Sequence, residues 1–190
     1  MEKQDFRKLK MELAIQTKSG VDFILSAGVV WFIIYLIWTL NFSSYEKSIF
    51  TFMIGAILLP MAFGVSKILK TNWKVKNNSL QPLGLWLNFA QLIYFPFLIF
   101  ILIKYPDYFI MTYAIITGAH LFPYAWLYEE LGYAITAILL SLGSLLIALN
   151  IALENMWYIP LFTSIVFFFL AGWIFIKLKQ NISMAPLTDK

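Results

Sequence analysis

Five side chains with polar groups follow one another through a long apolar stretch at steps of four, three, four and four residues. They are Tyr113, Thr117, His120, Tyr124 and Tyr128. This spacing predicts one face of a helix. His120 is the only histidine of the chain, and histidine can change its charge near neutral pH. The stripe therefore indicates a place where a proton or a polar ligand could be held.

Two shorter pairs of polar residues interrupt other apolar stretches. Asn88 and Gln91 are three positions apart, and Asp22 and Ser26 are four apart, so each pair shares a helix face. Polar groups at membrane depth are costly and usually face the interior of a helix bundle. We therefore expect a polar pocket that opens toward the cytoplasm and binds a ligand or a proton. Its lining would be His120, Tyr124, Thr117, Asn88, Gln91 and Asp22.

Each of these residues also has a purely structural interpretation. A single histidine within a membrane can serve as a hydrogen-bonding group between helices, and Asn88 and Gln91 can bridge helices in the same way. Asp22, Glu129 and Glu130 lie at the ends of predicted helices, where we expect solvated side chains.

No chemistry of a metal or a cofactor is expected. A histidine-based metal site usually needs two or three such ligands, and this chain has one histidine and no cysteine. Sequence motifs of hydrolases, phosphate-binding loops and dinucleotide sites are missing as well. We predict no catalytic residue, no metal and no cofactor, and the sequence favours a protein that is not an enzyme.

The composition indicates a membrane protein. Of 190 residues, 61% are hydrophobic and 13% are charged, whereas soluble domains average about 45–50% and about 25%. The apolar runs are about 20 residues long, which is enough for a helix to cross a hydrocarbon layer of about 30 Å. The predicted fold is all-α, a polytopic bundle of six transmembrane helices.

The predicted domain organisation has three parts. A polar, amphipathic segment (1–20) precedes the transmembrane domain (21–178), and a cytoplasmic tail (179–190) follows it. The expected spans are 21–40, 48–69, 83–103, 108–128, 131–153 and 156–178. Of the 14 lysine and arginine residues, only Lys47 and Lys104 fall on the side opposite to the termini. Because positive residues concentrate in cytoplasmic segments, both termini are predicted to be cytoplasmic.

A short pattern occurs twice. The stretches from Gly55 to Phe63 and from Gly118 to Trp126 share glycine, alanine, leucine, proline and alanine in register. Either the bundle contains repeated helical hairpins, or two apolar helices resemble each other by chance. At the positions that match Thr117, His120 and Tyr124, the first copy has Ile54, Ile57 and Met61. The helix shape therefore does not require the polar stripe.

Prolines within the two stretches predict interruptions of the helices. A proline cannot donate to the carbonyl four residues earlier. Pro123 therefore frees the carbonyl of Ala119 beside His120, and Pro60 frees that of Ala56.

The fifth predicted span carries a stripe of small residues, which lets helix backbones approach closely. We interpret it as a central packing helix. The stripe consists of Ala134, Ala137, Ser141, Ser144, Ala148 and Ala152.

The segment G-x-H-x-x-P at Gly118–Pro123, the short basic N-terminus and the six-span layout resemble small uncharacterised bacterial membrane proteins that are grouped as domains of unknown function. The resemblance implies a bacterial plasma membrane and no assigned activity.

The leading functional hypothesis is a small transporter or ligand-binding membrane protein with its site around His120. The alternative is a structural or partner-binding membrane subunit without transport. The expected partners are the lipid bilayer and either a second copy of the chain or another membrane protein. Nucleic acid is not an expected partner, because the chain has a single arginine, Arg7, and no basic stripe with interleaved aromatic residues.

Overall fold

The computed structural model describes residues 3–184, and this part of the chain consists of helices and turns with no strand. The predicted all-α class is confirmed. The α-helices are α1 (Lys3–Gln16), α2 (Val21–Trp38), α3 (Ser44–Gly55), α4 (Leu58–Leu69), α5 (Gln81–Leu92), α6 (Phe95–Lys104), α7 (Phe109–Ala119), α8 (Phe122–Leu127), α9 (Leu131–Asn150) and α10 (Tyr158–Met184). Short 3₁₀ turns η1 (Lys18–Gly20), η2 (Pro106–Tyr108) and η3 (Leu153–Asn155) join some of them.

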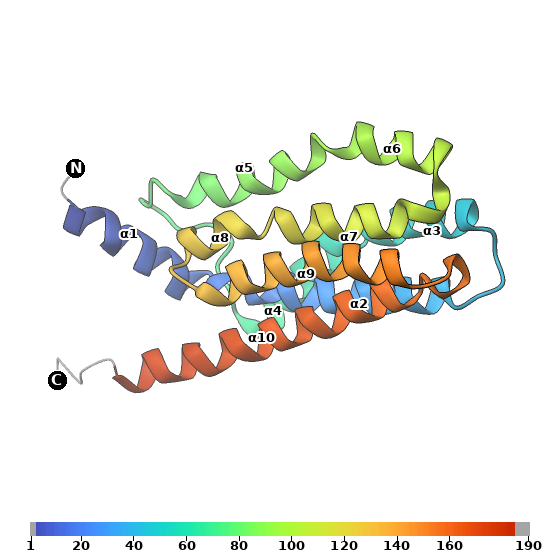
Figure 1. Ribbon diagram of the computed structural model, residues 1–190. Helices are drawn as coiled ribbons and strands as arrows, with labels where there is room; N and C mark the ends of the chain where they lie inside the picture. The colour runs from blue at the N-terminus through green and yellow to red at the C-terminus, as the bar shows by residue number, and fades with distance from the viewer. Residues whose placement is uncertain (1–2, 185–190) are drawn as a thin grey trace.

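Five helical segments are long and apolar enough to cross a membrane. They are Lys18–Trp38, Ser44–Leu69, Gln81–Lys104, Leu131–Asn150 and Leu153–Gln180. The remaining predicted span corresponds to α7 and α8, which run beside the others (Figure 1). This pair carries the polar stripe and is not among the five, so its crossing of the membrane stays a prediction.

The bundle has two ends, which differ in what they carry. We call one end the terminal face, because α1 and the C-terminal end of α10 both lie there, together with the 70–80 turn (Figure 1). The opposite end carries the 39–43 loop, η2 and η3, and we call it the distal face. Both ends of the described chain therefore lie on the same side of the bundle.

Continuous helices form the centre of the bundle. The most extensive helix–helix contact joins α2 to α10, and α9 packs against α7, α8 and α10. Trp31, Ile34, Leu140 and Phe167 are almost completely buried between these helices. Because apolar side chains gain little by leaving lipid for a protein interior, close packing holds such a core together.

The small-residue face of α9 produces that close packing. A Cβ atom on Gly118 of α7 would lie 2.6 Å from the Cβ of Leu140, so the two backbones approach as closely as glycine allows. Ala137, Ser144 and Ala148 are buried on the same helix. The predicted packing role of α9 is confirmed for these residues, whereas Ala152 is exposed beyond the helix end.

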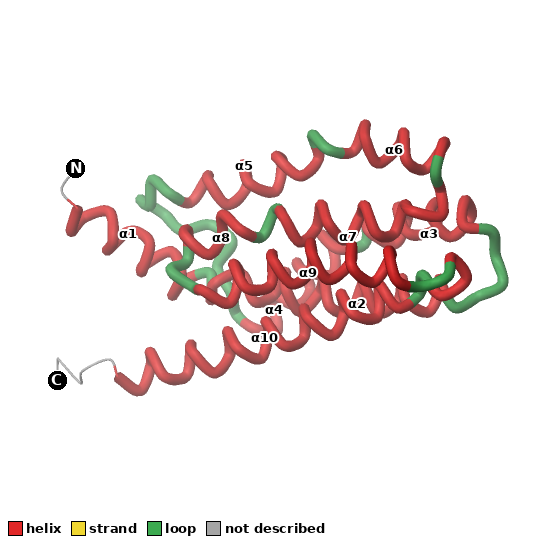
Figure 2. The backbone as a smooth tube through the Cα atoms, in the orientation of Figure 1, coloured by secondary structure: helices red, strands yellow, loops and turns green. Residues whose placement is uncertain are grey.

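The helices divide into continuous and broken ones. Within the described residues, α2, α9 and α10 run without interruption, whereas α3–α4, α5–α6 and α7–α8 are each divided by a short turn (Figure 2). A proline follows each turn, namely Pro60, Pro96 and Pro123. The two breaks predicted from Pro60 and Pro123 are confirmed. The break before Pro96 was not expected.

The distal halves of the three broken helices have similar lengths. The halves on the distal side are α3 with 12 residues, α6 with 10 and α7 with 11. At a rise of about 1.5 Å per residue, these lengths correspond to roughly 15–18 Å. This is about half of a hydrocarbon layer of about 30 Å. We call this level, defined by residues 56–57, 93–94 and 120–121, the break layer.

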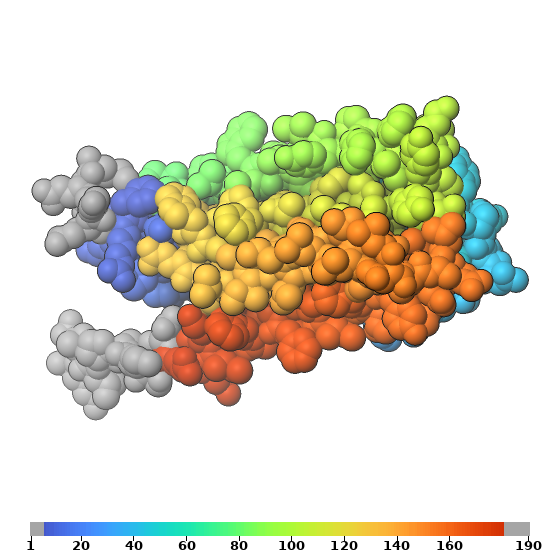
Figure 3. Space-filling model, in the orientation of Figure 1, coloured from blue at the N-terminus to red at the C-terminus, as the bar shows by residue number. Residues whose placement is uncertain are grey.

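The α5–α6 pair lies at the periphery. It bows outward above α7 and α8 (Figure 1) and forms a ridge along the molecule in the space-filling view (Figure 3). Leu98 is its only buried residue, while Trp86 and Ile93 are 67% and 77% exposed. Without lipid or a partner, this pair has little apolar surface covered.

Helices extend into both segments that are expected to flank the transmembrane domain, and the boundaries themselves stay predictions. The first 20 residues hold α1 and η1, and Gly20 adopts the left-handed conformation (φ 69°) just before α2 begins. At the other end, α10 continues to Met184, past the expected border at residue 178. The last six positions of the predicted tail, 185–190, lie outside the described residues.

Candidate functional site

The break between α7 and α8 lies at His120. This residue caps the C-terminus of α7, and its half-buried ring places Nδ1 2.6 Å from the carbonyl oxygen of Thr117. A carbonyl oxygen can only accept, so in this contact Nδ1 carries the proton and Nε2 remains an acceptor. Because Pro123 has no N–H, the carbonyl of Ala119 also lacks its helical donor. The break thus gathers two acceptors on adjacent residues.

Thr117 adds a hydroxyl group without a partner. Its side chain is 6% exposed, and its Oγ1 makes no hydrogen bond. In the part of the chain that the structure describes, the only other buried side-chain polar atom of this kind is the Oγ of Ser144 on α9. Leaving a buried polar group unpaired costs about 1–3 kcal/mol. The free hydroxyl is therefore a feature that needs an explanation.

A shared acceptor brings Tyr124 and Asn88 together. The hydroxyl of Tyr124 donates to the carbonyl oxygen of Gly84 (2.8 Å), and the Nδ2 of Asn88 donates to the same oxygen (3.2 Å). The ring of Tyr124 meets that of His120 edge to face, with centroids 6.1 Å apart. Four of the predicted site residues, on α5, α7 and α8, therefore lie in one connected group, the His120 cluster (Thr117, His120, Tyr124 and Asn88).

Gln91 lies on the same helix as Asn88, two positions before the break at Ile93. Its side chain is half-buried and makes no hydrogen bond within the described residues. It shares a helix face with Asn88 at a spacing of three residues, but no contact joins it to His120. Its place in the site stays a prediction.

Asp22 belongs to a different network. Its side chain is 1% exposed, and Oδ2 accepts hydrogen bonds from Thr71 Oγ1 (2.8 Å) and Trp73 Nε1 (2.6 Å). These bonds attach the start of α2 to the turn that follows α4. The expectation that Asp22 is solvated is wrong, because the turn folds over it. None of its hydrogen bonds reaches the His120 cluster.

Glu130 is a second buried carboxylate that was expected to be solvated. It is 6% exposed, accepts a hydrogen bond from Trp173 Nε1 (2.7 Å) and lies 3.5 Å from Lys177 Nζ. It also caps α9 by accepting from the N–H of Gly132. The expectation fails because α10 passes beside the start of α9 and covers the carboxylate. Sequence reasoning missed Trp173 and Lys177, whose spacing of four places them on one face of α10.

Glu129, in contrast, remains partly exposed and holds α1. Lys10 Nζ lies 3.0 Å from its carboxylate and donates to the carbonyl of Trp126 (3.1 Å). The same ammonium group is 4.5 Å from the centroid of the Trp126 ring. Lys10 is 7% exposed, so α1 is fastened to the α8–α9 turn through a buried cation.

Aromatic rings fill the path from His120 to the terminal face. The rings of Tyr124, Tyr128 and Tyr133 lie 5.7–5.8 Å from one another, and the hydroxyl of Tyr133 donates to the carbonyl of Ser19. Two cavities lie elsewhere in the described part of the chain, and neither is lined by His120. One, of about 490 Å³, opens at the distal face, and the other is an apolar groove between α9 and α10. The expected opening toward the cytoplasm stays a prediction.

The described residues contain no group of three or more histidine, cysteine, aspartate or glutamate side chains that could hold a metal ion. The His120 cluster itself offers one imidazole nitrogen, one free hydroxyl and backbone carbonyls. These groups can form hydrogen bonds to a small polar molecule or accept a proton.

The apolar helices and their packing define a membrane protein of the helical-bundle class. Residues 6–177 match the family of unknown function DUF7010, and the chain belongs to this family. The resemblance to domain-of-unknown-function proteins that the sequence indicated is therefore confirmed. No curated protein and no solved structure matches the chain.

Proposed function

We propose that the protein is a six-span membrane protein that binds or transports a small solute at the break layer, with the His120 cluster as the polar site. The observation that carries this proposal is the arrangement of three broken helices beside three continuous ones. In many transporters, discontinuous helices hold the solute near the middle of the bilayer. Distal halves about half as long as the hydrocarbon layer is thick would put the break layer at the corresponding depth.

The energetics of the backbone support this proposal. In hydrocarbon, a carbonyl without a donor costs several kcal/mol, so a broken helix persists only where protein, water or a ligand satisfies the freed groups. Pro60, Pro96 and Pro123 each remove one donor at this level. The α7–α8 break is the one that contains His120 and lies within the His120 cluster. A bound solute would supply the missing donors.

The chemistry of the cluster favours an uncharged polar solute or a proton. His120 Nε2 and the Ala119 carbonyl can accept, and the hydroxyl of Thr117 can donate or accept. No carboxylate or ammonium group is bonded to the cluster in the described residues. The buried Asp22 and Glu130 have partners of their own at the terminal face.

The lysine distribution supports an orientation. Lys47 and Lys104 are the only basic residues assigned to the distal face, which suits the outer side of a bacterial plasma membrane. The terminal face would then be cytoplasmic, and both termini would lie inside the cell.

Flux through proteoliposomes tests the proposal. We would impose a pH gradient and compare the wild type with His120→Gln, using Thr112→Val as a control. Thr112 lies on the same helix, and its hydroxyl donates to the carbonyl of Tyr108. We expect flux in the wild type and in the control, and a loss of at least about tenfold in His120→Gln. Equal flux in all three proteins, or no flux of protons or small polar solutes in any, would contradict it.

The exposed α5–α6 pair favours a second candidate function, a partner-binding membrane subunit. Its outer surface carries large apolar side chains, including Trp86, Phe89, Ile93 and Phe97. Either lipid or another protein covers such a surface. If a partner does, Trp86→Ala combined with Ile93→Ala would lower the mass of the detergent-solubilised complex, as measured by light scattering. An unchanged monomeric mass in both proteins would reject this candidate.

A further inference from the structure

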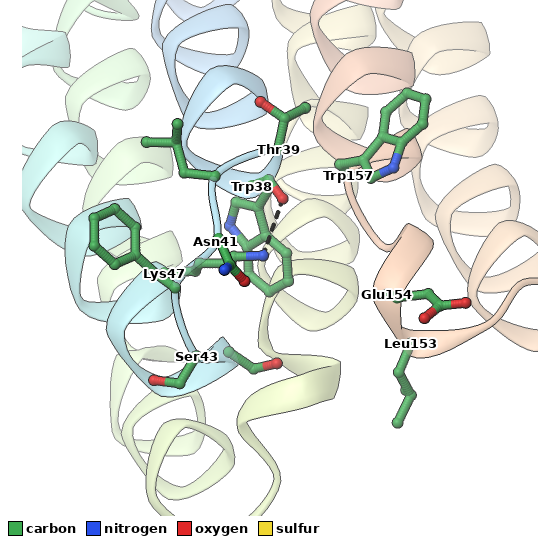
Figure 4. Close-up of a pocket in the computed structure, with 11 residues that line it drawn as sticks. Trp38, Thr39, Asn41, Ser43, Lys47, Leu153, Glu154 and Trp157 are labelled. Carbon is green, nitrogen blue, oxygen red and sulfur yellow. Dashed lines mark hydrogen bonds between the residues drawn. The ribbon is translucent and has the colours of Figure 1, made fainter.

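The distal face contains a cavity that the proposed solute site does not use. It lies between the end of α2, the start of α3 and the turn before α10, and its volume is about 490 Å³. Small-molecule sites usually have volumes of about 300–1,000 Å³. Figure 4 shows Lys47 and Trp38 on one side of this cavity and Glu154 and Trp157 on the other. The cavity is thus lined by one positive and one negative side chain, and one indole ring lies on each side of it (Figure 4).

Lys47 is held in place but keeps free donors. Its Nζ donates to the backbone carbonyl of Trp38 (3.1 Å) and lies 5.8 Å from the centroid of the Trp38 indole ring. An ammonium group has three donors, so two remain for a ligand. Within the described residues Lys47 forms no ion pair with the neighbouring Glu46, whose carboxylate accepts hydrogen bonds from the N–H (2.9 Å) and the hydroxyl (2.7 Å) of Ser43.

The opposite side can receive a cation. Within the described residues, the carboxylate of Glu154 makes no ion pair and no hydrogen bond. The indole of Trp157, which lines the same side of the cavity, is stacked on Tyr158 with ring centroids 3.8 Å apart, so the ring is fixed. The face of a tryptophan attracts ammonium groups, in particular quaternary ones. A carboxylate and an indole that line the same side of a cavity are therefore suitable groups to receive an amine.

We propose that this cavity binds a small zwitterion, whose anionic group contacts Lys47 and whose ammonium group lies between Glu154 and Trp157. The same chemistry occurs in a free zwitterionic solute and in a zwitterionic lipid headgroup. The side chains that carry the inference are separate from the His120 cluster, so it does not depend on transport through the break layer.

Isothermal titration of the purified full-length protein in a charge-neutral detergent tests the inference. The probes are phosphoethanolamine and glycine betaine, compared with ethanolamine alone and with inorganic phosphate alone. We expect at least one zwitterion to bind. Ethanolamine and inorganic phosphate, which carry charge of one sign only, should each bind at least about tenfold more weakly. Failure of both zwitterions to bind at up to about 10 mM, or equal binding of the single-charge probes, would overturn the inference.

Variants assign the site. Glu154→Gln changes an exposed side chain without a partner, so we expect the protein to fold and its affinity for the zwitterion to fall at least about tenfold. Lys47→Gln should weaken binding similarly, and its folding is checked separately by thermal unfolding because it loses the bond to Trp38. Lys104→Gln and Asp107→Asn remove the same charges from the other distal turn, outside the cavity. Wild-type affinity in Glu154→Gln, or an equal loss in the two controls, would overturn the inference.

The source of the ligand is resolved in nanodiscs. If a lipid headgroup occupies the cavity, phosphatidylethanolamine in the disc should abolish binding of free phosphoethanolamine to the wild type. The Glu154→Gln protein should not bind free phosphoethanolamine in these discs either. If the ligand is a free solute, binding should be the same in discs with and without this lipid. Both results support a zwitterion site and differ only in where its ligand comes from.

Discussion

The hydroxyl of Tyr124 donates a hydrogen bond of 2.8 Å to the carbonyl oxygen of Gly84, 40 positions earlier in the chain. This bond joins α8 to α5, a helix that has no buried residue of its own. The same oxygen accepts from Asn88. The His120 cluster therefore depends on how closely the peripheral α5–α6 pair stays against α8.

Tyr124→Phe should loosen this attachment with little change to the rest of the bundle. Hydrogen bonds between membrane helices contribute about 0.6 kcal/mol on average and at most about 2 kcal/mol. Because the chain has no cysteine, a single cysteine at position 88 reports on the exposure of α5. We expect faster maleimide labelling at this position in Tyr124→Phe, and an unchanged rate in Tyr94→Phe, whose ring is 56% exposed. Equal labelling rates would show that the bond does not hold α5.

Gly118→Ala should destabilise the contact between α7 and α9. The new Cβ would lie 2.6 Å from the Cβ of Leu140 and 3.1 Å from the Oγ of Ser141. Overpacking of this kind costs about 1–3 kcal/mol, and thermal unfolding in detergent would measure it. Gly64→Ala and Gly172→Ala are matched controls on α4 and α10, because a Cβ there meets nothing within 4 Å. A Gly118→Ala protein as stable as these controls would contradict the close approach.

Asp22→Ala should detach the turn after α4 from the start of α2. It leaves the hydroxyl of Thr71 and the indole N–H of Trp73 without their acceptor. Hydrogen bonds to a charged group contribute about 1.5–3 kcal/mol, so a lower unfolding temperature and a red shift of tryptophan fluorescence are expected. Asp107→Ala, at the opposite face, serves as the control. Unchanged stability in Asp22→Ala would mean that the turn is held by other contacts.

Lys10→Met should release α1 from the bundle. The substitution removes the ion pair with Glu129 and the hydrogen bond to the carbonyl of Trp126, while it keeps a long apolar side chain. Hydrogen exchange followed by mass spectrometry should show faster exchange in α1 and no change in α2. Lys8→Met changes an exposed lysine of the same helix and should leave the exchange rates as they are. Protection of α1 equal to that of the wild type would contradict the role of Lys10.

The sequence predicted well the features that depend on a few neighbouring residues. Apolar length and composition located the helices, because only about 20 apolar residues can cross the hydrocarbon. The breaks at Pro60 and Pro123 were predictable because a proline removes one specific helical donor. The polar stripe from Thr117 to Tyr124 was also predictable, because the helical period continues across the short break.

The features that the sequence did not predict depend on distant segments. Asp22 and Trp73 are 51 positions apart, and Glu130 and Trp173 are 43 apart. A carboxylate at a helix end is solvated unless another element covers it, and helix order alone does not say which element passes there. The distal cavity also depends on distant segments. Two separate turns form it, and their approach follows from the packing of α2 against α10.

The alternation of broken and continuous helices has a mechanical consequence. A continuous helix transmits tension along its whole hydrogen-bonded length, whereas a turn such as that at residues 56–57 gives way before the next half is loaded. A force applied to the C-terminal end of the chain would therefore extract first α10 and then α9, each as a whole span. The segments from α8 back to α3 would unfold one half-helix at a time. The protein thus combines three continuous helices with three helices that can yield at a turn near their middle.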